Sequence, residues 1–266
     1  MLSLIAALAL SATPCTPLPG MEPVLADPAR RIVMLGETHG TTELPSAFAD
    51  AVCAAAGQGP VVVALEWLPE NQAHLDAWLA SDGSPAAREA LMTAPAWSDR
   101  IGRASGAMLR LLEDVRRMRA AGMPVSLLAF DAPATPPAPT DLAREQGMAA
   151  LVLKAADAQP DARVLVLTGA GHADRTAFTS FGAEVPSMIR HLPAGRVLSL
   201  AWIRPGGQVW GCRAPEGGGA AVCGVYDAPV RDEARPRGAG LGAPRPGFDG
   251  WFSGGASITA SAPAKP

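Results

Sequence analysis

The sequence predicts an α/β fold: a mostly parallel sheet covered by helices on both faces, with a short antiparallel β appendage at the C-terminal end. Two patterns predict it. Short, continuous apolar segments, typical of strands that are buried on both faces of a sheet, alternate with longer segments whose apolar residues recur at helical spacing. Of the 266 residues, 48% are hydrophobic, so the chain can bury a sizeable core.

Four apolar segments are predicted to be parallel strands, because helical segments separate them and supply the crossover connections that parallel neighbours require. In chain order they are RIVML (31–35), VVVAL (61–65), PVSLLAF (124–130) and RVLVLT (163–168).

The helical segments carry start and stop signals. They are expected over residues 43–57, 69–81, 98–122 and 140–158. Gly57 is a stop signal, Pro69 is typical of a first helical turn, and Ser98 is the expected cap of the third helix. The proline-rich loop at 132–139, before the fourth helix, could serve as a lid.

The character of the chain changes from about residue 196. The segments RVLSLAWI (196–203), GQVWGCRA (207–214) and AVCGVYDAP (221–229) predict shorter strands joined by turns. We expect them to be antiparallel additions at the edge of the sheet. The interpretation is a single domain over residues 21–266, with a β extension over about 196–266.

The first residues, MLSLIAALALSATPC (1–15), contain an apolar run of signal-peptide length followed by small residues. We therefore predict a signal peptide and leader over residues 1–20, and a periplasmic or secreted protein. The run is too short for a membrane span. No Lys or Arg precedes Arg30, so a misassigned start or an apolar tail is the alternative.

The four cysteines are predicted to form disulfides, in keeping with an oxidising compartment. Cys212 and Cys223 flank a glycine-rich turn of a predicted hairpin and form the first expected pair, and Cys15 and Cys53 form the second. The alternative is buried free thiols. No CxxC pair occurs, which disfavours a structural zinc site.

Composition bears on the partners of the chain. Its formal net charge is −3, without a basic stripe, and only 5% of its residues are aromatic. We therefore expect no nucleic-acid partner and instead a small-molecule or peptide substrate. The sequence indicates no oligomeric state.

Titratable residues follow every predicted parallel strand. The first strand runs into GETHG (36–40), the second into Glu66 and Trp67, the third into Asp131, and the fourth into TGAGHA, which contains His172. Ligands of open parallel sheets bind beyond the carboxyl ends of the strands. We therefore predict that these side chains meet at one edge of the sheet.

The candidate catalytic residues are Glu37, His39, Glu66 and His172, and Gly-x-x-His occurs twice among them, each time after an apolar strand. The same four residues could bind Mn, Co or Zn, which would turn a water into a hydroxide nucleophile. Without a metal, Glu37 or Glu66 would act as the general base while the imidazoles orient a water. Trp67 would wall the cleft beside His39 and His172, the cofactor-binding histidines.

Structural roles are the alternative for each candidate. His39 and His172 could cap a helix or make structural hydrogen bonds, and the two glutamates could be salt-bridged to Arg103 or Arg144. The chain has no Gly-x-Ser-x-Gly motif, which disfavours a serine hydrolase, and no glycine-rich phosphate-binding loop.

These motifs resemble those of the ChaN-like, Tiki and erythromycin-esterase-like superfamily. LGETHG is similar to its Gly-Glu-x-His motif, VVVALEWL to its Ala-Leu-Glu strand, and VLVLTGAGHA to its Gly-x-Gly-His motif. The resemblance follows the chain in order over most of residues 30 to 262, including the closing FDGWFSGGASITASAP. The shared positions are Glu37, His39, Glu66 and His172.

Members of this superfamily differ in activity. Tiki-like members are metal-dependent proteases, esterase-like members hydrolyse a macrolide lactone, and ChaN-like members bind haem in connection with iron uptake. Together with the predicted signal peptide, the resemblance leads us to expect an exported protein that hydrolyses an ester or amide, with a divalent metal. It implies as alternatives a haem- or metal-binding protein without catalysis, or a scaffold that keeps only the fold. Haem ligation is associated with tyrosine in this group, and the only tyrosine here is Tyr226, in the β extension.

Overall fold

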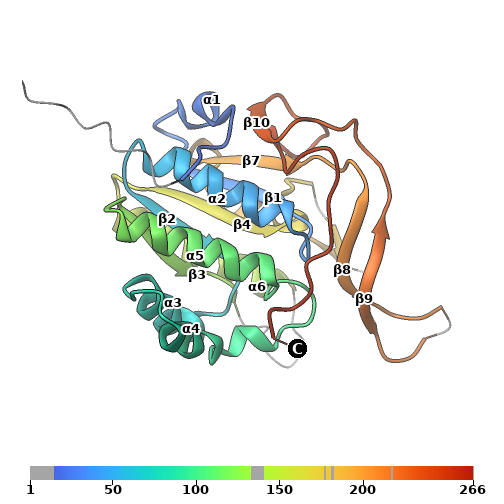
Figure 1. Cartoon of the computed structure of the whole chain (residues 1–266). Helices are drawn as coiled ribbons and strands as arrows, with labels where there is room; N and C mark the ends of the chain where they lie inside the picture. Colours follow the sequence, from blue (N-terminus) through green and yellow to red (C-terminus); the bar gives the residue numbers. More distant parts are fainter. Residues whose placement is uncertain (1–14, 133–140, 177, 181–182, 217, 266) are drawn as a thin grey trace, which may run out of the picture.

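A seven-stranded sheet forms the centre of the described structure, with the strand order β10-β11-β7-β1-β4-β2-β3 (Figure 1). The computed structural model describes residues 15–132, 141–176, 178–180, 183–216 and 218–265. The sheet strands are β1 Ile32–Glu37, β2 Val61–Leu65, β3 Val125–Ala129, β4 Arg163–Gly169, β7 Val197–Trp202, β10 Gly238–Leu241 and β11 Gly250–Ser253. Only β10, among these, pairs antiparallel to its neighbour, so the predicted mostly parallel sheet is confirmed.

Helices cover both faces of this sheet. The α-helices are α1 Met21–Leu25, α2 Glu43–Ala56, α3 Gln72–Leu79, α4 Pro85–Met92, α5 Gly106–Ala120, α6 Asp141–Ala158 and α7 Ala170–Ala173. Short 3-10 turns are η1 Pro69–Asn71, η2 Pro95–Ser98, η3 Met188–His191 and η4 Ala194–Arg196, and a small hairpin is formed by β5 Phe178–Ser180 and β6 Ala183–Val185. Helices α2 and α5 lie side by side across one face (Figure 1), and α6 packs on the other.

Successive residues of each central strand pack on opposite faces. Val33 and Leu35 of β1 belong to the core shared with α2 and α5, whereas Ile32 and Met34 belong to the core shared with α6. Side chains alternate between the two faces of a strand, so a strand covered on both faces must be apolar at every position. This explains why the strand segments of the sequence are continuous apolar runs.

The structure differs from the sequence predictions, which do not include the strands β10 and β11 or the helices α1 and α4. β7 is not an antiparallel addition at the edge, because it runs parallel between β1 and β11 inside the sheet. The helix expected from Ser98 begins only at Gly106, because the Ser105 hydroxyl caps it by accepting a hydrogen bond from the Met108 backbone N–H at 3.3 Å. Residues 99–105 therefore form a loop, called here loop 99–105.

The antiparallel C-terminal β appendage is confirmed as a hairpin of β8 Gly207–Arg213 and β9 Val222–Ala228 (Figure 1). Its predicted place at the edge of the main sheet is wrong, because the two strands form a separate sheet. Cys212 and Cys223 face each other across this hairpin and form a disulfide. Cys15 and Cys53 form the second disulfide, so both predicted pairs are present.

The predicted signal peptide and the proline-rich loop at 132–139 lie largely outside the described residues. Among the residues that are described, no helix combines the length and the apolar character that crossing a membrane would require.

Candidate functional site

The ends of four neighbouring parallel strands form one rim of the sheet. Glu37, the last residue of β1, is in register with Gly169, the last residue of β4. Glu66 directly follows β2, and Asp131 lies two residues beyond β3. His39 follows β1 by two residues, and His172 lies in α7, immediately after β4. The structure therefore brings the four predicted site residues together.

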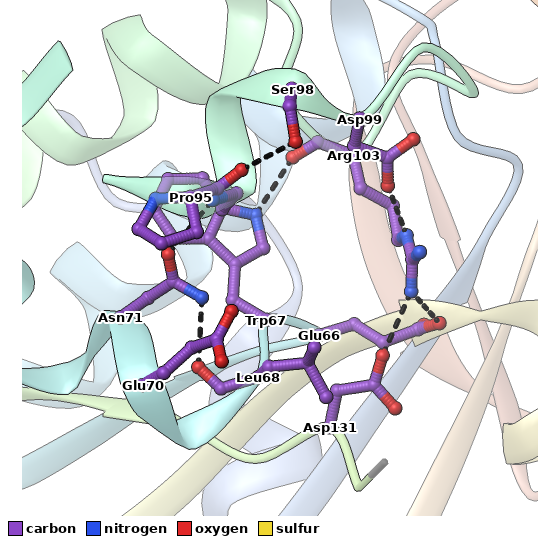
Figure 2. Close-up of a pocket in the computed structure, with 11 residues that line it drawn as sticks. Glu66, Trp67, Leu68, Glu70, Asn71, Pro95, Ser98, Asp99, Arg103 and Asp131 are labelled. Atoms are coloured by element: carbon purple, nitrogen blue, oxygen red, sulfur yellow. Dashed lines mark hydrogen bonds and ion pairs between the residues drawn. The ribbon is translucent and has the colours of Figure 1, made fainter. Parts of the chain in front are cut away.

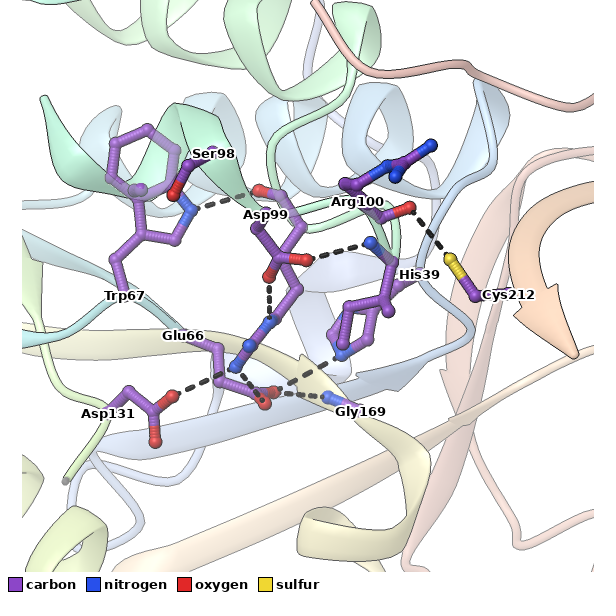
Figure 3. Close-up of polar contacts among 12 residues, drawn as sticks. His39, Glu66, Trp67, Ser98, Asp99, Arg100, Asp131, Gly169 and Cys212 are labelled. Carbon is purple, nitrogen blue, oxygen red and sulfur yellow. Dashed lines mark hydrogen bonds and ion pairs between the residues drawn. The ribbon is translucent and has the colours of Figure 1, made fainter. Parts of the chain in front are cut away.

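Glu66 lies at the centre of this group. Its Oε2 atom accepts a hydrogen bond from the Gly169 backbone N–H at 2.8 Å (Figure 3). The same oxygen accepts from the Thr168 hydroxyl at 2.8 Å. Its Oε1 atom accepts from Arg144 Nη2 at 2.9 Å and faces Arg103 Nη1 at 3.4 Å. The alternative that a site glutamate pairs with these two arginines is thus confirmed for Glu66.

The two imidazoles approach Glu66 from opposite sides. His39 Nε2 lies 3.6 Å from Glu66 Oε2, and His172 Nε2 lies 3.6 Å from Glu66 Oε1. The Nδ1 atom of His39 hydrogen-bonds to Glu37 Oε1 at 2.9 Å, and that of His172 lies 2.7 Å from Glu145 Oε1. Each imidazole therefore lies between two carboxylates, one of which is the shared Glu66.

This arrangement raises the pKa of both imidazoles. Burial acts to lower the pKa of His39, but the charge of Glu66 and the hydrogen bond with Glu37 outweigh it and raise the pKa from 6.5 to about 10. Burial also opposes the charge on His172, but its hydrogen bonds with Glu145 and Glu66 raise its pKa to about 9. Both imidazoles are consequently protonated at neutral pH.

The pKa values of Glu66 and Glu37 are shifted in opposite directions. Burial acts to raise the pKa of Glu66, but the charge of His39 and the hydrogen bonds with both imidazoles hold it well below the usual 4.5. Burial raises the pKa of Glu37, and its hydrogen bond with His39 only partly offsets this. Glu37 is 4% exposed, and its Oε2 atom has no hydrogen-bond partner among the described residues. It lies beneath His39 rather than in contact with solvent.

A cavity of about 510 Å³ opens in front of the imidazoles. It is lined by His39, Glu66, Leu68, Ile101, Arg103, Asp131, Ala132, Arg144 and His172. We call it the imidazole cavity. Its volume lies within the range of small-molecule sites in proteins.

A second cavity of about 320 Å³ lies beside it and shares Glu66, Leu68, Arg103 and Asp131 with it. In Figure 2, Arg103 extends from Asp99 to Glu66 and Asp131 and so borders this second cavity. Trp67 lines the second cavity rather than the imidazole cavity. It is 3% exposed, and its indole N–H donates to the Arg103 carbonyl at 2.9 Å, so it also supports loop 99–105.

Glu145 is a site residue that sequence reasoning missed. It lies on α6, is 1% exposed, and also accepts a hydrogen bond from the Met188 backbone N–H at 2.6 Å. The adjacent polar pair of Arg144 and Glu145 has the sequence character of a solvent-exposed helix face. No spacing rule distinguishes such a face from one that turns toward the rim of a sheet.

The contacts of Glu66 and His172 bear on the predicted metal site. Both oxygens of Glu66 already accept hydrogen bonds, and the guanidinium of Arg144 lies 3.3 Å from His172 Nε2. A fixed cation at that position would repel a divalent metal. Among the described residues no group of three or more His, Cys, Asp or Glu is arranged to hold a metal ion. The donor set does not fit a metal in this arrangement, and metal binding stays a prediction of the resemblance.

The haem alternative also stays a prediction. Tyr226 lies in the β8–β9 hairpin, where its hydroxyl donates to the Val222 carbonyl at 2.5 Å and Arg213 stacks 4.2 Å from its ring centre. It does not line the imidazole cavity.

No sequence-family model matches the chain, and no curated protein sequence matches it. Solved structures nevertheless share its fold. An erythromycin esterase mutant in its open conformation is 13% identical with a TM-score of 0.62, over 91% of this chain and 93% of that one. A Bacillus cereus protein is 12% identical with a TM-score of 0.63, over 92% and 93% of the two chains.

A succinoglycan biosynthesis protein is 9% identical with a TM-score of 0.64, over 91% of this chain and 92% of that one. The chain therefore shares the fold of these three solved structures, one of which is an erythromycin esterase. At these identities, the likeness concerns the fold and not the activity.

Proposed function

We propose that this chain is a hydrolase that adds water to an ester or amide bond in the imidazole cavity. The observation that carries the proposal is the pair of Glu–His units on the shared Glu66. Glu37 and Glu145 each hold one Nδ1 atom, so each Nε2 atom is directed toward Glu66 at the rim of the cavity. The fold shared with an erythromycin esterase agrees with this reaction class.

Glu37 and Glu145 act as positioning residues. A carboxylate only accepts hydrogen bonds, so the Nδ1 atom that faces it carries the proton, and proton exchange is left to Nε2. The third member of a catalytic triad plays the same part, fixing the tautomer and the ring orientation of its histidine.

The reaction needs one neutral and one protonated imidazole. The neutral Nε2 atom takes a proton from water as the oxygen adds to the substrate carbonyl carbon. The oxyanion that forms is stabilised by the N–H groups of Arg103 and Arg144 at the cavity wall. As the bond to the leaving group breaks, the protonated imidazole donates its proton to the departing oxygen or nitrogen.

In this mechanism the general base is an imidazole and not Glu37 or Glu66. Glu66 is a weak base, because its pKa is low and both of its oxygens accept hydrogen bonds. Glu37 does not line the imidazole cavity. Glu66 instead keeps the two imidazoles and the two arginines in place.

We also propose that the protein is exported. Its two disulfides are of the kind that persists in oxidising compartments.

The test is hydrolysis of a panel of aryl esters, lactones and peptides by the purified full chain, with and without a chelator. His39→Asn and His172→Asn are compared with His74→Asn, a histidine on α3 outside the site. We expect the wild type to hydrolyse at least one ester. This activity should persist in the presence of the chelator and in His74→Asn, and it should be lost in His39→Asn and His172→Asn. A panel without turnover, or site variants with wild-type rates, would contradict the proposal. Loss of turnover with the chelator would instead support the predicted metal.

A further inference from the structure

We propose that the imidazole cavity binds an oxyanion group, a carboxylate or a phosphate, against Arg103 and Arg144, and that this group is part of the substrate. The second half of this statement rests on the proposed function. The anion site itself rests only on how charge is distributed around the cavity.

Positive groups form the exposed layer of the cavity wall. The side chains of His39, Arg103 and Arg144 are 20%, 23% and 22% exposed. The carboxylates that balance them lie beneath, with Glu66 and Asp131 only 5% and 6% exposed. A ligand that enters the cavity therefore meets cationic side chains before it meets carboxylates.

Both guanidinium groups are held in fixed positions. Arg103 donates from Nη1 to Asp131 Oδ2 at 2.9 Å, and Arg144 donates from Nε to Asp131 Oδ1 at 2.8 Å. The Nε atom of Arg103 is held by Asp99 at 2.7 Å. Side chains that are already ordered lose little conformational entropy when a ligand binds, so binding an anion here is favoured over binding at mobile surface arginines.

Donor capacity remains at this wall. Arg103 uses Nε and Nη1 in these contacts, and no described residue accepts a hydrogen bond from its Nη2 group. Hydrogen bonds between guanidinium groups and carboxylate or phosphate oxygens are about twice as strong as neutral ones. Leu68, Ile101 and Ala132 give the same cavity an apolar part, which suits a larger molecule that carries the anion.

The second cavity is lined by different charges. Besides the shared residues it is lined by Glu70 and Asp99, and it lacks His39, Arg144 and His172. An anion is therefore directed to the imidazole cavity, next to the proposed reaction centre. This places the charged group of the substrate close to the bond that is cleaved.

The anion site is tested by titrating the full chain with inorganic phosphate, sulfate or acetate at constant ionic strength. Calorimetry and the shift of the melting temperature measure the binding. We expect saturable binding that Arg103→Gln and Arg144→Gln weaken about 10-fold, because each removes a charge-assisted contact. Arg103→Lys keeps the charge and should recover part of the affinity. Arg100→Gln, an exposed arginine of the same loop, should change the affinity by less than about 2-fold.

Hydrolysis separates this inference from the proposed function. Paired esters that differ only in a carboxylate or phosphate near the scissile bond are compared, and we expect the charged member to have the higher kcat/KM. Turnover of uncharged esters without saturable anion binding by the wild type would overturn the anion site and leave the hydrolase in place. Anion binding without turnover of any ester would support the anion site and contradict the hydrolase.

Discussion

The Nε2 atom of His39 lies 3.6 Å from Oε2 of Glu66, while the other oxygen of the same carboxylate lies 3.6 Å from Nε2 of His172. Glu66 therefore connects the two imidazoles electrostatically. Groups that share a charged neighbour in this way lose their protons in steps that belong to the pair.

His39→Asn and His172→Asn are each expected to reduce kcat/KM about 1,000-fold, because each removes one proton-transfer group. The double variant should be little worse than either single variant, since the two act as a unit. Steady-state kinetics on the best ester of the panel measures this. Strictly additive losses would show that the two imidazoles act independently.

The pH profile of kcat/KM is expected to be bell-shaped with its maximum between about 9 and about 10, the raised pKa values of the pair. At lower pH both imidazoles are protonated and no base is present, and at higher pH both are neutral and no acid is present. A maximum near 6.5, the ordinary histidine pKa, would show that Glu66 does not raise the pKa of the two imidazoles.

Glu145→Gln is expected to shift the rising limb of this profile to lower pH, because the hydrogen bond with Glu145 is the largest contribution that raises the pKa of His172. The change should also reduce kcat/KM about 10- to 100-fold, as replacing a group that orients a catalytic ligand does. Glu89→Gln, an exposed glutamate on α4, is the control. A lower rate with an unshifted profile would assign Glu145 a structural role only.

Gly169→Ala is expected to lower kcat/KM about 100-fold with little change in melting temperature. A Cβ atom at this position would lie 3.2 Å from His39 Nε2, which is tighter than an ordinary contact, and 3.5 Å from His172 Cδ2, so it would displace the imidazole of His39. Gly171→Ala is the matched control, because a Cβ atom there meets nothing within 4 Å. Equal rates for the two variants would indicate that the space between the imidazoles is not used.

Glu66→Gln is expected to destabilise the protein by about 3 kcal/mol near neutral pH, because it removes the buried charge that faces Arg103, Arg144 and both imidazoles and leaves Asp131 as the buried carboxylate that the two arginines share. The raised pKa of His39 adds stability that is complete below pH 6.5 and is lost as the pH rises through about 10. The difference in free energy of unfolding between the wild type and Glu66→Gln should therefore be larger near pH 6 than near pH 10. Urea unfolding at both pH values measures it, and a difference that grows with pH would contradict the assignment.

Strand positions could be predicted closely from the sequence, but strand order could not. The segment at 61–65 matches β2 because its five residues are fully apolar and bounded by Pro60 and Glu66. The sequence predicts residues 196–203 at the edge of the sheet, together with the short strands that follow them, whereas β7 pairs with β1 inside the sheet. Such pairing depends on contacts between segments that are far apart along the chain.

The site could be predicted where it follows directly from the strands. Glu37, Glu66 and His172 lie at or just beyond strand ends, and parallel strands bring their carboxyl ends to one rim. The sequence indicates Arg103 and Arg144 only as salt-bridge partners of the glutamates, and it does not indicate Glu145, because these residues reach the rim from a helix and a loop. Their positions depend on how α6 and loop 99–105 pack, which periodicity does not specify.

An NMR titration of the imidazole nitrogens of His39 and His172, in the wild type and in Glu66→Gln, tests the shared-carboxylate pair most directly and needs no substrate. The account predicts that both wild-type imidazoles stay protonated well above pH 6.5, to about 10 and about 9, and that the Glu66 change lowers both values. Two imidazoles that titrate separately near 6.5, with no response to the Glu66 change, would contradict it.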